Sequence, residues 1–199
     1  SNVKLIQNKI QGINIVKKAF GKGFSPYDRI GNFKDVFEKY RLGKQSFIEL
    51  LKSIRRLFIA TEFSKVSGKQ IGYVLFQDFI PDNDSDIRVV IIGKKAFAIK
   101  RLVRKNDFRA SGSGFIEYDK EKIDERCISL AFETSKKLKA QCLAYDFVFD
   151  KNNSPLIIEI NYGYALEGYA GCPGYWDDKL NWHEGKFNST HWMVDLFIN

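Results

Sequence analysis

The sequence lacks any apolar stretch long enough to cross a membrane. Its longest apolar runs, such as VVII at residues 89–92, fall far short of the roughly 20 residues that a transmembrane helix needs. No signal peptide opens the chain, and its first residue is Ser rather than Met. We therefore expect a protein without membrane partners, present as a fragment or a processed chain.

Cysteine and histidine are both scarce. The three cysteines, Cys127, Cys142 and Cys172, have neither metal nor redox spacing, and an odd number argues against a disulfide framework. Reduced thiols in a cytoplasmic protein are the prediction. The two histidines, His183 and His191, belong to no recognisable catalytic arrangement, so we expect both to be structural.

Positive charge is in excess, with a formal net charge of +8. A basic surface suits nucleic acid, an anionic membrane or a polyanionic small molecule such as a nucleotide, although a plain solvated basic face is equally compatible. The basic residues are spread along the chain, with short clusters at 52–56 and 99–105. Because no nucleic-acid motif accompanies them, nucleic acid is an unlikely partner.

The order of the expected elements indicates an α+β protein, in which a helical lobe precedes a mostly antiparallel sheet covered by helices. Apolar residues at helical spacing predict helices over 9–20, 33–42, 46–58, about 120–140 and 190–198. Strand patterns occur at 3–6, 71–79, 86–92 and 96–104, and a hairpin occupies 145–161.

The hairpin YDFVFDKNNSPLIIEIN places two carboxylates inside apolar strands. If Asp150 pairs with Pro155 across the turn, then Asp146 lies directly opposite Glu159. The same register pairs Val148 with Ile157 and Ala144 with Asn161, and it gives the core face Tyr145, Phe147, Phe149, Leu156, Ile158 and Ile160.

Facing carboxylates repel each other and destabilise a sheet by about 0.2–1 kcal/mol. A cation between Asp146 and Glu159 removes this cost. With the amide oxygen of Asn161, these side chains form the oxygen set that Mg²⁺ prefers. The alternative is that all three are solvent-facing polar residues on a half-exposed sheet.

A second hairpin gathers arginines. If Gly93 and Lys94 form a two-residue turn, Asp86 faces Arg101, and Arg88 lies on the same face two residues along. Guanidinium groups in such positions can hold a phosphoryl group through bidentate hydrogen bonds. A surface ion pair worth about 0–1 kcal/mol is the alternative.

Together, the stretches QDFIPDNDSDIRVVIIG, AFAIKR, DFRASGSG and YDFVFD…PLIIEIN resemble the ATP-grasp superfamily. The branch of glutathione synthetase and the ribosomal-protein glutamate ligases is the most similar one. The resemblance extends over residues 1–168, and residues 70–163 carry its specific motifs.

The resemblance assigns a role to each of these motifs. It implies that Mg²⁺ (or Mn²⁺) bridging the phosphates of ATP is held by Asp146, Glu159 and Asn161. It implies that adenine is recognised by the hinge Gln77, Asp78, Phe79 and Ile80, that Asp82 or Asp84 lies near the ribose, and that Ile158 lies near adenine. It also implies that phosphate or an acyl phosphate is contacted by Arg88, Arg101 and Arg109.

Two subdomains follow from the same resemblance. Residues 1–79 are expected to form part of the small ATP-grasp subdomain, with a helical insertion. Residues 80–199 are expected to form the C-terminal subdomain with the metal site, followed by an aromatic-rich tail over 164–199 that covers the sheet or selects the substrate. The loop SGSG at 111–114 is expected either to move near the substrate or to be a plain surface loop.

The implied reaction is ATP-dependent ligation of a carboxylate to an amine or a related nucleophile through an acyl phosphate. The alternative is a non-catalytic, degenerate ATP-grasp module that binds a polyanion or a protein partner. Phosphotransfer on the same fold is a minor third option. The family's two phosphate-binding lysines and its preceding N-terminal domain have no counterpart in this sequence.

We therefore predict that this chain by itself binds nucleotide weakly and turns over no substrate, because half of the phosphate contacts are missing. Isothermal titration calorimetry with Mg·ATP should detect no tight complex. A dissociation constant in the low micromolar range would contradict this prediction.

Overall fold

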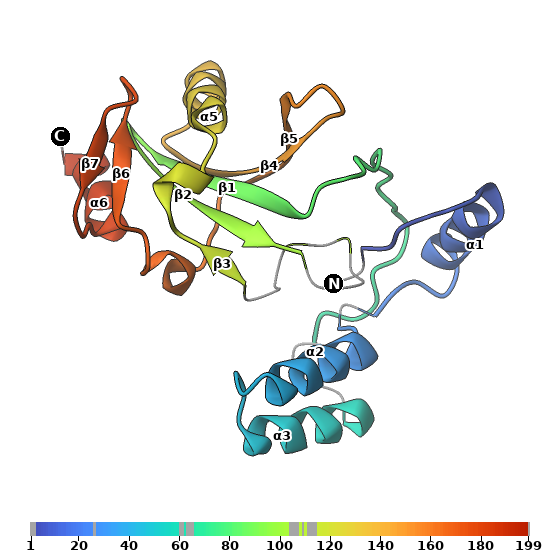
Figure 1. Cartoon of the computed structure of the whole chain (residues 1–199). Coiled ribbons are helices and arrows are strands. Elements are labelled where there is room, and N and C mark those ends of the chain that lie inside the picture. Colours follow the sequence, from blue (N-terminus) through green and yellow to red (C-terminus); the bar gives the residue numbers. More distant parts are fainter. Residues whose placement is uncertain are drawn as a thin grey trace. The chain divides into compact units, whose positions relative to one another are not determined.

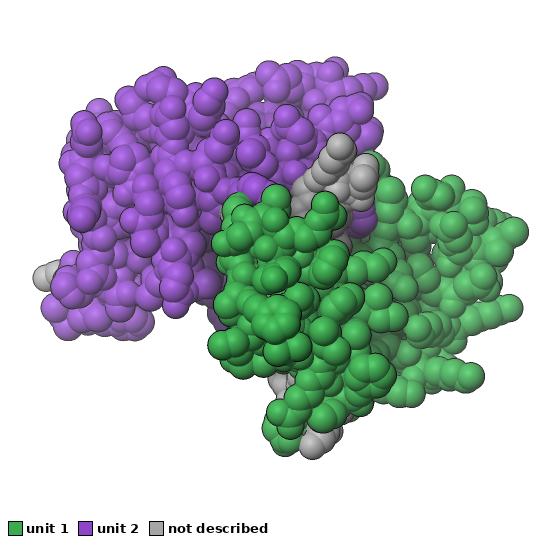
Figure 2. Space-filling model, turned by 60° about the horizontal axis from the view of Figure 1, so that its bottom comes forward, with its two compact units in different colours: residues 1–79 green, residues 80–199 purple. Residues whose placement is uncertain are grey.

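The computed structural model describes residues 3–25, 27–59, 62, 66–103, 108, 110 and 115–198. The chain divides into two compact units, residues 1–79 and residues 80–199 (Figure 2). Helices and one antiparallel sheet make it an α+β protein, as predicted. None of the described helices has the length and apolar character needed to cross a bilayer.

The first unit is helical in its described part. The helices with fully described bounds are α1 (Lys9–Phe20), α2 (Arg29–Arg41) and α3 (Phe47–Phe58). Each begins after a side chain that accepts a hydrogen bond from a backbone N–H of the first turn, namely Asn8, Asp28 and Ser46. Helix α2 packs against α3, and it begins before the predicted residue 33 because Asp28 caps it.

The strands predicted at 3–6 and 71–79 are wrong, since neither segment is a strand in the described part of the chain. Gln70 forms an isolated bridge with Phe24, with backbone hydrogen bonds in both directions. Beyond it the chain forms neither helix nor strand up to residue 79, and Tyr73, Leu75 and Phe76 are exposed. An apolar β-type pattern needs a partner strand to become a sheet, and this segment pairs with none that the structure describes.

The second unit is built on a seven-stranded sheet (Figure 1). Along the sheet the order is β5–β4–β1–β2–β6–β7, and β3 pairs with β2. The strands are β1 (Ser85–Ile92), β2 (Lys95–Leu102), β3 (Ile116–Glu117), β4 (Cys142–Phe149), β5 (Pro155–Asn161), β6 (Gly174–Asp177) and β7 (Trp182–Glu184). The helices are α5 (Glu125–Leu138) and α6 (Ser189–Ile198), with short 3₁₀ turns at Lys120–Lys122 and Leu166–Tyr169. Strands β3, β6 and β7 were not predicted.

The β1–β2 hairpin has the predicted turn and register. Gly93 adopts a φ of 57° in the turn, which favours glycine. Asp86 pairs with Arg101 across the two strands. A Cβ atom at Gly93 would also lie 2.7 Å from the Leu196 side chain, so α6 packs closely against this turn.

The β4–β5 hairpin has the predicted register only in the half that lies away from the turn. Asp146 pairs with Glu159 and Ala144 with Asn161. Nearer the turn the register shifts by one residue, which pairs Val148 with Leu156 rather than with Ile157. The extra residue is Ile158, at a β-bulge between the two halves.

The bulge changes which residues of β5 face the core. Ile157 rather than Leu156 packs against the cluster that contains Tyr145 and Phe147, and Leu156 is exposed. Predicting Leu156 on the core face was therefore wrong. Ile158 lies at the register shift, so simple alternation no longer assigns it to either face.

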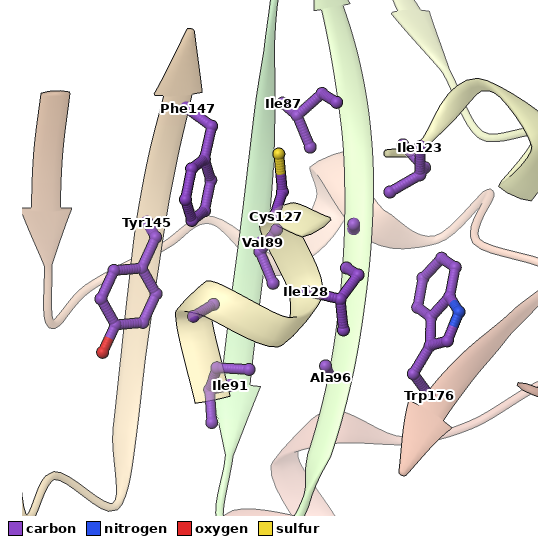
Figure 3. Close-up of a cluster of buried hydrophobic side chains, with 12 residues drawn as sticks. Ile87, Val89, Ile91, Ala96, Ile123, Cys127, Ile128, Tyr145, Phe147 and Trp176 are labelled. Carbon is purple, nitrogen blue, oxygen red and sulfur yellow. The ribbon is translucent and has the colours of Figure 1, made fainter. Parts of the chain in front are cut away.

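Helix α5 covers one face of the sheet. Ile128 and Cys127 of the helix pack against Val89, Tyr145 and other buried residues of the strands (Figure 3). Ser135 of α5 also exchanges a hydrogen bond of 2.6 Å with the Tyr145 hydroxyl. This layer is the larger of the two cores and holds β1, β2 and β4 in one sheet.

The tail covers part of the opposite face. Phe97 of β2 is fully buried there and contacts the rings of Tyr164, Tyr169, Phe187 and Trp192, with centroid separations of 5.0–6.2 Å. Strands β6 and β7 extend the sheet beyond β2. Of the two roles expected for the tail, the structure shows the covering one.

The side chains at the start of α5 are expected to make the stability of the protein depend on pH. Asp124 caps the helix by accepting from the Arg126 N–H at 2.9 Å, and Arg126 Nη2 lies 2.6 Å from its carboxylate. The hydrogen bonds from the Arg126 side chain thereby lower the pKa of Asp124 below the ordinary value of an aspartate. A lowered folded-state pKa stabilises the protein above the unfolded-state pKa, and this contribution is lost as the pH falls through the folded-state value.

Asp124→Asn keeps a capping side chain but loses this charge. Its free energy of unfolding should therefore fall less than that of the wild type between about pH 4 and pH 2. The difference should be below about 1 kcal/mol, because both side chains are partly exposed to solvent. Urea denaturation across this range measures the difference. Arg126→Gln should show the same flattening, and an unchanged pH slope in both variants would contradict the prediction.

Candidate functional site

Polar residues gather on the sheet face that the tail covers in part. Arg88 of β1, Asp146 of β4 and Glu159 of β5 form one cross-strand row, because Arg88 pairs with Asp146 and Asp146 with Glu159. Two residues along β1, Asp86 pairs with Arg101 of β2 on the same face. The predicted arginines and carboxylates are therefore neighbours in the sheet.

Four of these side chains form one ion-pair network. Arg88 donates to Asp146 through Nε at 2.5 Å and through Nη2 at 2.6 Å. Arg101 donates to Asp86 through Nε and Nη2, both at 2.6 Å. The Nη2 group of Arg101 also lies 2.8 Å from Oδ2 of Asp146. Asp146 is thus shared by two guanidinium groups.

The network is nearly buried. The side chains of Asp146, Asp86 and Arg101 are 5%, 8% and 9% exposed, and that of Arg88 is 16% exposed. The charges of the two carboxylates and two guanidinium groups cancel, and such pairing is needed because an unpaired charge is costly to bury. Removing one partner from such a buried network costs about 3–5 kcal/mol, because it leaves a charge without compensation. A weak surface ion pair, the alternative considered for Asp86 and Arg101, does not describe this arrangement.

Burial and pairing shift the pKa values of the network in identifiable directions. Burial raises the pKa of Asp86, and the hydrogen bonds from Arg101 oppose this rise without cancelling it. Burial by itself would lower the pKa of Arg88, but hydrogen bonding and attraction to Asp146 outweigh it and raise the pKa. Both arginines therefore remain charged at any physiological pH.

Glu159 and Asn161 lie at the open edge of this face on β5. Glu159 is exposed, and the Asn161 amide nitrogen is 3.5 Å from its carboxylate. The Asn161 side-chain oxygen accepts from the Gly163 N–H at 3.0 Å. These contacts leave acceptor capacity on both side chains, because a carboxylate and an amide oxygen each offer more than one lone pair.

The donor set suits a hard cation, although Asp146 is engaged. Two hydrogen bonds from Arg88 and the ion pair with Arg101 occupy three of its about four acceptor directions, so Oδ1 keeps one. Asp146, Glu159 and Asn161 are all oxygen donors in adjacent positions of one face, as Mg²⁺ requires. The described residues contain no cluster of three His, Cys, Asp or Glu side chains that could hold a metal.

The predicted adenine hinge forms neither helix nor strand, and the chain passes from the first unit to the second within it. Gln77, Asp78 and Phe79 end the first unit and Ile80 begins the second. Their contacts with a nucleotide stay a prediction. Arg109 and the loop 111–114 lie outside the described residues.

The segment just before β1 is attached to the end of β4. Asn83 accepts from the Phe149 N–H at 2.9 Å and donates to the Phe149 carbonyl at 3.0 Å. Its neighbours Asp82 and Asp84, predicted near the ribose, are both exposed. The sequence pattern did not single out Asn83, since a polar residue in a loop gives no sign of such a distant contact.

Tyr169 is the residue of this site that the sequence did not reveal. It is buried beside Phe97, and its hydroxyl interacts with Arg88. Burial raises the pKa of Tyr169, and Arg88 and Arg101 oppose the rise. No local pattern distinguishes this tyrosine from the others in the tail.

Two of the thiols are buried, and His183 has contacts of a structural kind. Burial raises the pKa of Cys127 and of Cys172 to about 12, which suppresses the reactive thiolate. His183 contacts Asp177 at 3.0 Å and stacks on Tyr175. These are structural roles, and they leave the arginine–carboxylate face as the candidate site.

Comparisons with known proteins bear on the family of the chain. No curated protein matches the chain in sequence. Similar solved structures are the macrocyclases MdnB (17% identity, TM-score 0.34) and MdnC with precursor peptide MdnA (12%, 0.39), both from Microcystis aeruginosa MRC, and the ATP-grasp ligase PsnB with a minimal precursor (17%, 0.34). The matches cover 45%, 58% and 45% of this chain and 31%, 33% and 29% of those chains.

The chain thus spans about a third of the length of these neighbours, and at such low TM-scores the likeness carries no argument. The family comparison is stronger. A model of the RimK-like ATP-grasp domain matches residues 53–172, which is more than half of the chain and includes every strand of the arginine–carboxylate face. The chain belongs to the RimK-like ATP-grasp domain family.

Proposed function

We propose that the protein containing this ATP-grasp ligase-type domain is an ATP- and Mg²⁺-dependent (or Mn²⁺-dependent) ligase that joins a carboxylate to an amine or a related nucleophile. The observation that carries the proposal is the row of Arg88, Asp146 and Glu159 beside Arg101 on one sheet face. It offers fixed positive charge next to oxygen ligands, which is what transfer of a phosphoryl group needs.

Asp146, Glu159 and Asn161 are the residues proposed to hold the metal. Their oxygen donors and shared face support this assignment. A divalent ion held there would neutralise negative charge that develops on the phosphate oxygens. Because the four-residue network is neutral and Glu159 adds one negative charge, a divalent ion leaves a net positive site for a polyphosphate.

In the proposed reaction, a carboxylate oxygen of the substrate attacks the γ-phosphorus of ATP. The new O–P bond gives an acyl phosphate, and the bond to the bridging oxygen breaks to release ADP. The amine then attacks the carbonyl carbon, and phosphate leaves. Arg88 and Arg101, with Arg109, are proposed to bind the phosphoryl oxygens during both steps, so the protein supplies position and charge rather than a nucleophile.

The nucleotide is proposed to lie along the hinge. Gln77, Asp78, Phe79 and Ile80 would meet the adenine edge, Asp82 or Asp84 the ribose, and Ile158 the adenine ring. The bulge supports the role of Ile158, because it removes this half-buried residue from the regular core alternation. The cytoplasmic location predicted from the thiols stays a prediction.

One observation favours the non-catalytic alternative. Residues 1–79 contain 15 Lys and Arg against 6 Asp and Glu, whereas residues 80–199 contain 17 against 18. The first unit thus carries the entire positive excess, +9 against −1 in the second, and could bind a polyanion without any chemistry. Tight, salt-sensitive binding of nucleic acid that is unaffected by nucleotides would favour this reading.

The ligase proposal predicts the effect of two substitutions in the full-length protein. Asp146→Asn and Glu159→Gln should each lower ATP-dependent phosphate release by about 100-fold or more, because each removes a charged oxygen ligand from the site. Phosphate release is measured at saturating ATP, with circular dichroism to verify folding. Glu133→Gln on the exposed surface of α5 is the matched control and should leave the rate unchanged. Unchanged release in both site variants would refute the assignment.

A further inference from the structure

The two arginines of the network are held unequally. Asp86 accepts from Nε and Nη2 of Arg101, each at 2.6 Å, and Asp146 adds a third contact to Arg101 at 2.8 Å. In the described part of the chain, the ion pairs of Arg88 involve Asp146 alone, at 2.5 and 2.6 Å. Arg101 therefore has a carboxylate of its own, whereas Arg88 relies on the shared one.

Exposure divides the arginines in the same way. The Arg88 side chain is 16% exposed, compared with 9% for Arg101 and 8% for Asp86. Arg88 also lies in the cross-strand row that leads through Asp146 to the exposed Glu159. Of the two guanidinium groups, it is the one nearer to solvent and to any ligand that enters from this edge.

We propose that Asp86 is a positioning residue that keeps Arg101 in place and that Arg88 is the exchangeable arginine. When a cation shares the charge of Asp146, Arg88 leaves this carboxylate and binds an anionic oxygen of the substrate. This inference rests on the proposed function for the identity of the ligand. The unequal anchoring itself depends only on the contacts of the chain.

The physical reason lies in the strength of charge-assisted hydrogen bonds. Bonds to an ionised carboxylate are about twice as strong as bonds between neutral groups, and a carboxylate that shares its charge with a cation is a weaker acceptor. Arg101 then keeps both contacts to Asp86, but Arg88 loses strength in both of its own. The Tyr169 hydroxyl interacts with Arg88 and can guide it, although a neutral hydroxyl does not replace a carboxylate.

A test needs no ligand, because Asp146→Asn imitates a carboxylate whose charge is neutralised. The NMR resonances of the arginine Nε–H groups are recorded on this chain and assigned with Arg88→Lys and Arg101→Lys. In Asp146→Asn, the Arg88 resonance should move to the position of a free arginine, and that of Arg101 should stay. Movement of both, of Arg101 alone or of neither would overturn the proposal.

Asp86→Asn is the complementary variant and the safeguard if Asp146→Asn does not fold. It should displace the Arg101 resonance and leave that of Arg88 in place, and Asp86→Glu should restore Arg101 at least in part. Displacement of Arg88 in Asp86→Asn would show that the four residues act as one unit, against the proposal.

The unmodified chain gives a third readout. Rotation of the Arg101 guanidinium about its Nε–Cζ bond should be slower than that of Arg88, and equal rates would contradict the unequal anchoring even if neither variant folds. Because no experiment in this series involves ATP, a failure here is distinguishable from an absence of phosphate release in the full-length protein.

Discussion

The buried carboxylate of Asp146, shared by two arginines, is the interaction on which the second unit depends. Its partners come from two different strands, Arg88 from β1 and Arg101 from β2. Because side chains alternate between the faces of a sheet, a slip of one residue in either pairing would place members of an ion pair on opposite faces and leave buried charges without compensation. The buried charges are therefore balanced only in this register of the strands.

The two faces of the sheet differ in their roles. One face stabilises the fold, and the other carries the candidate site. The face under α5 is apolar and continuous, and it includes Val89 and Tyr145. On the other face, Tyr169 belongs to the cluster of buried rings around Phe97, and it also interacts with Arg88 of the charged network. The low-dielectric wall formed by the tail strengthens the nearby ion pairs, because charges interact more strongly away from water.

Local periodicity predicted the parts of the site that lie within one hairpin. The facing of Asp86 and Arg101 follows from alternation and turn length. The facing of Asp146 and Glu159 was predicted from a turn in which Asp150 pairs with Pro155, whereas Phe149 pairs with Pro155 and the bulge restores the predicted pair. The contact between Arg88 and Asp146 could not be predicted in this way, because it joins residues 58 positions apart and requires knowing that β1 lies beside β4.

The failures have the same origin. Apolar alternation at 71–79 predicted a strand, but a strand also needs a partner, and the sequence of the segment contains no information about one. The strands β6 and β7 are short and lie among glycine and aromatic residues, so their pattern was too brief to separate from a loop. The placement of Tyr169 depends on how the whole tail packs, which no local pattern reports.

The bulge at Ile158 has a consequence for how this hairpin can change during evolution. In a regular hairpin the turn sets the register of every pair, so a residue gained or lost there would move Glu159 away from Asp146. Here the pairs on either side of Ile158 follow separate registers. Deletion of Ile158 would leave a continuous ladder of hydrogen-bonded pairs in which every residue keeps its partner. A change of register that begins at the turn could likewise be absorbed at the bulge. The hairpin therefore has a place where its length can vary while its two carboxylates stay opposite each other.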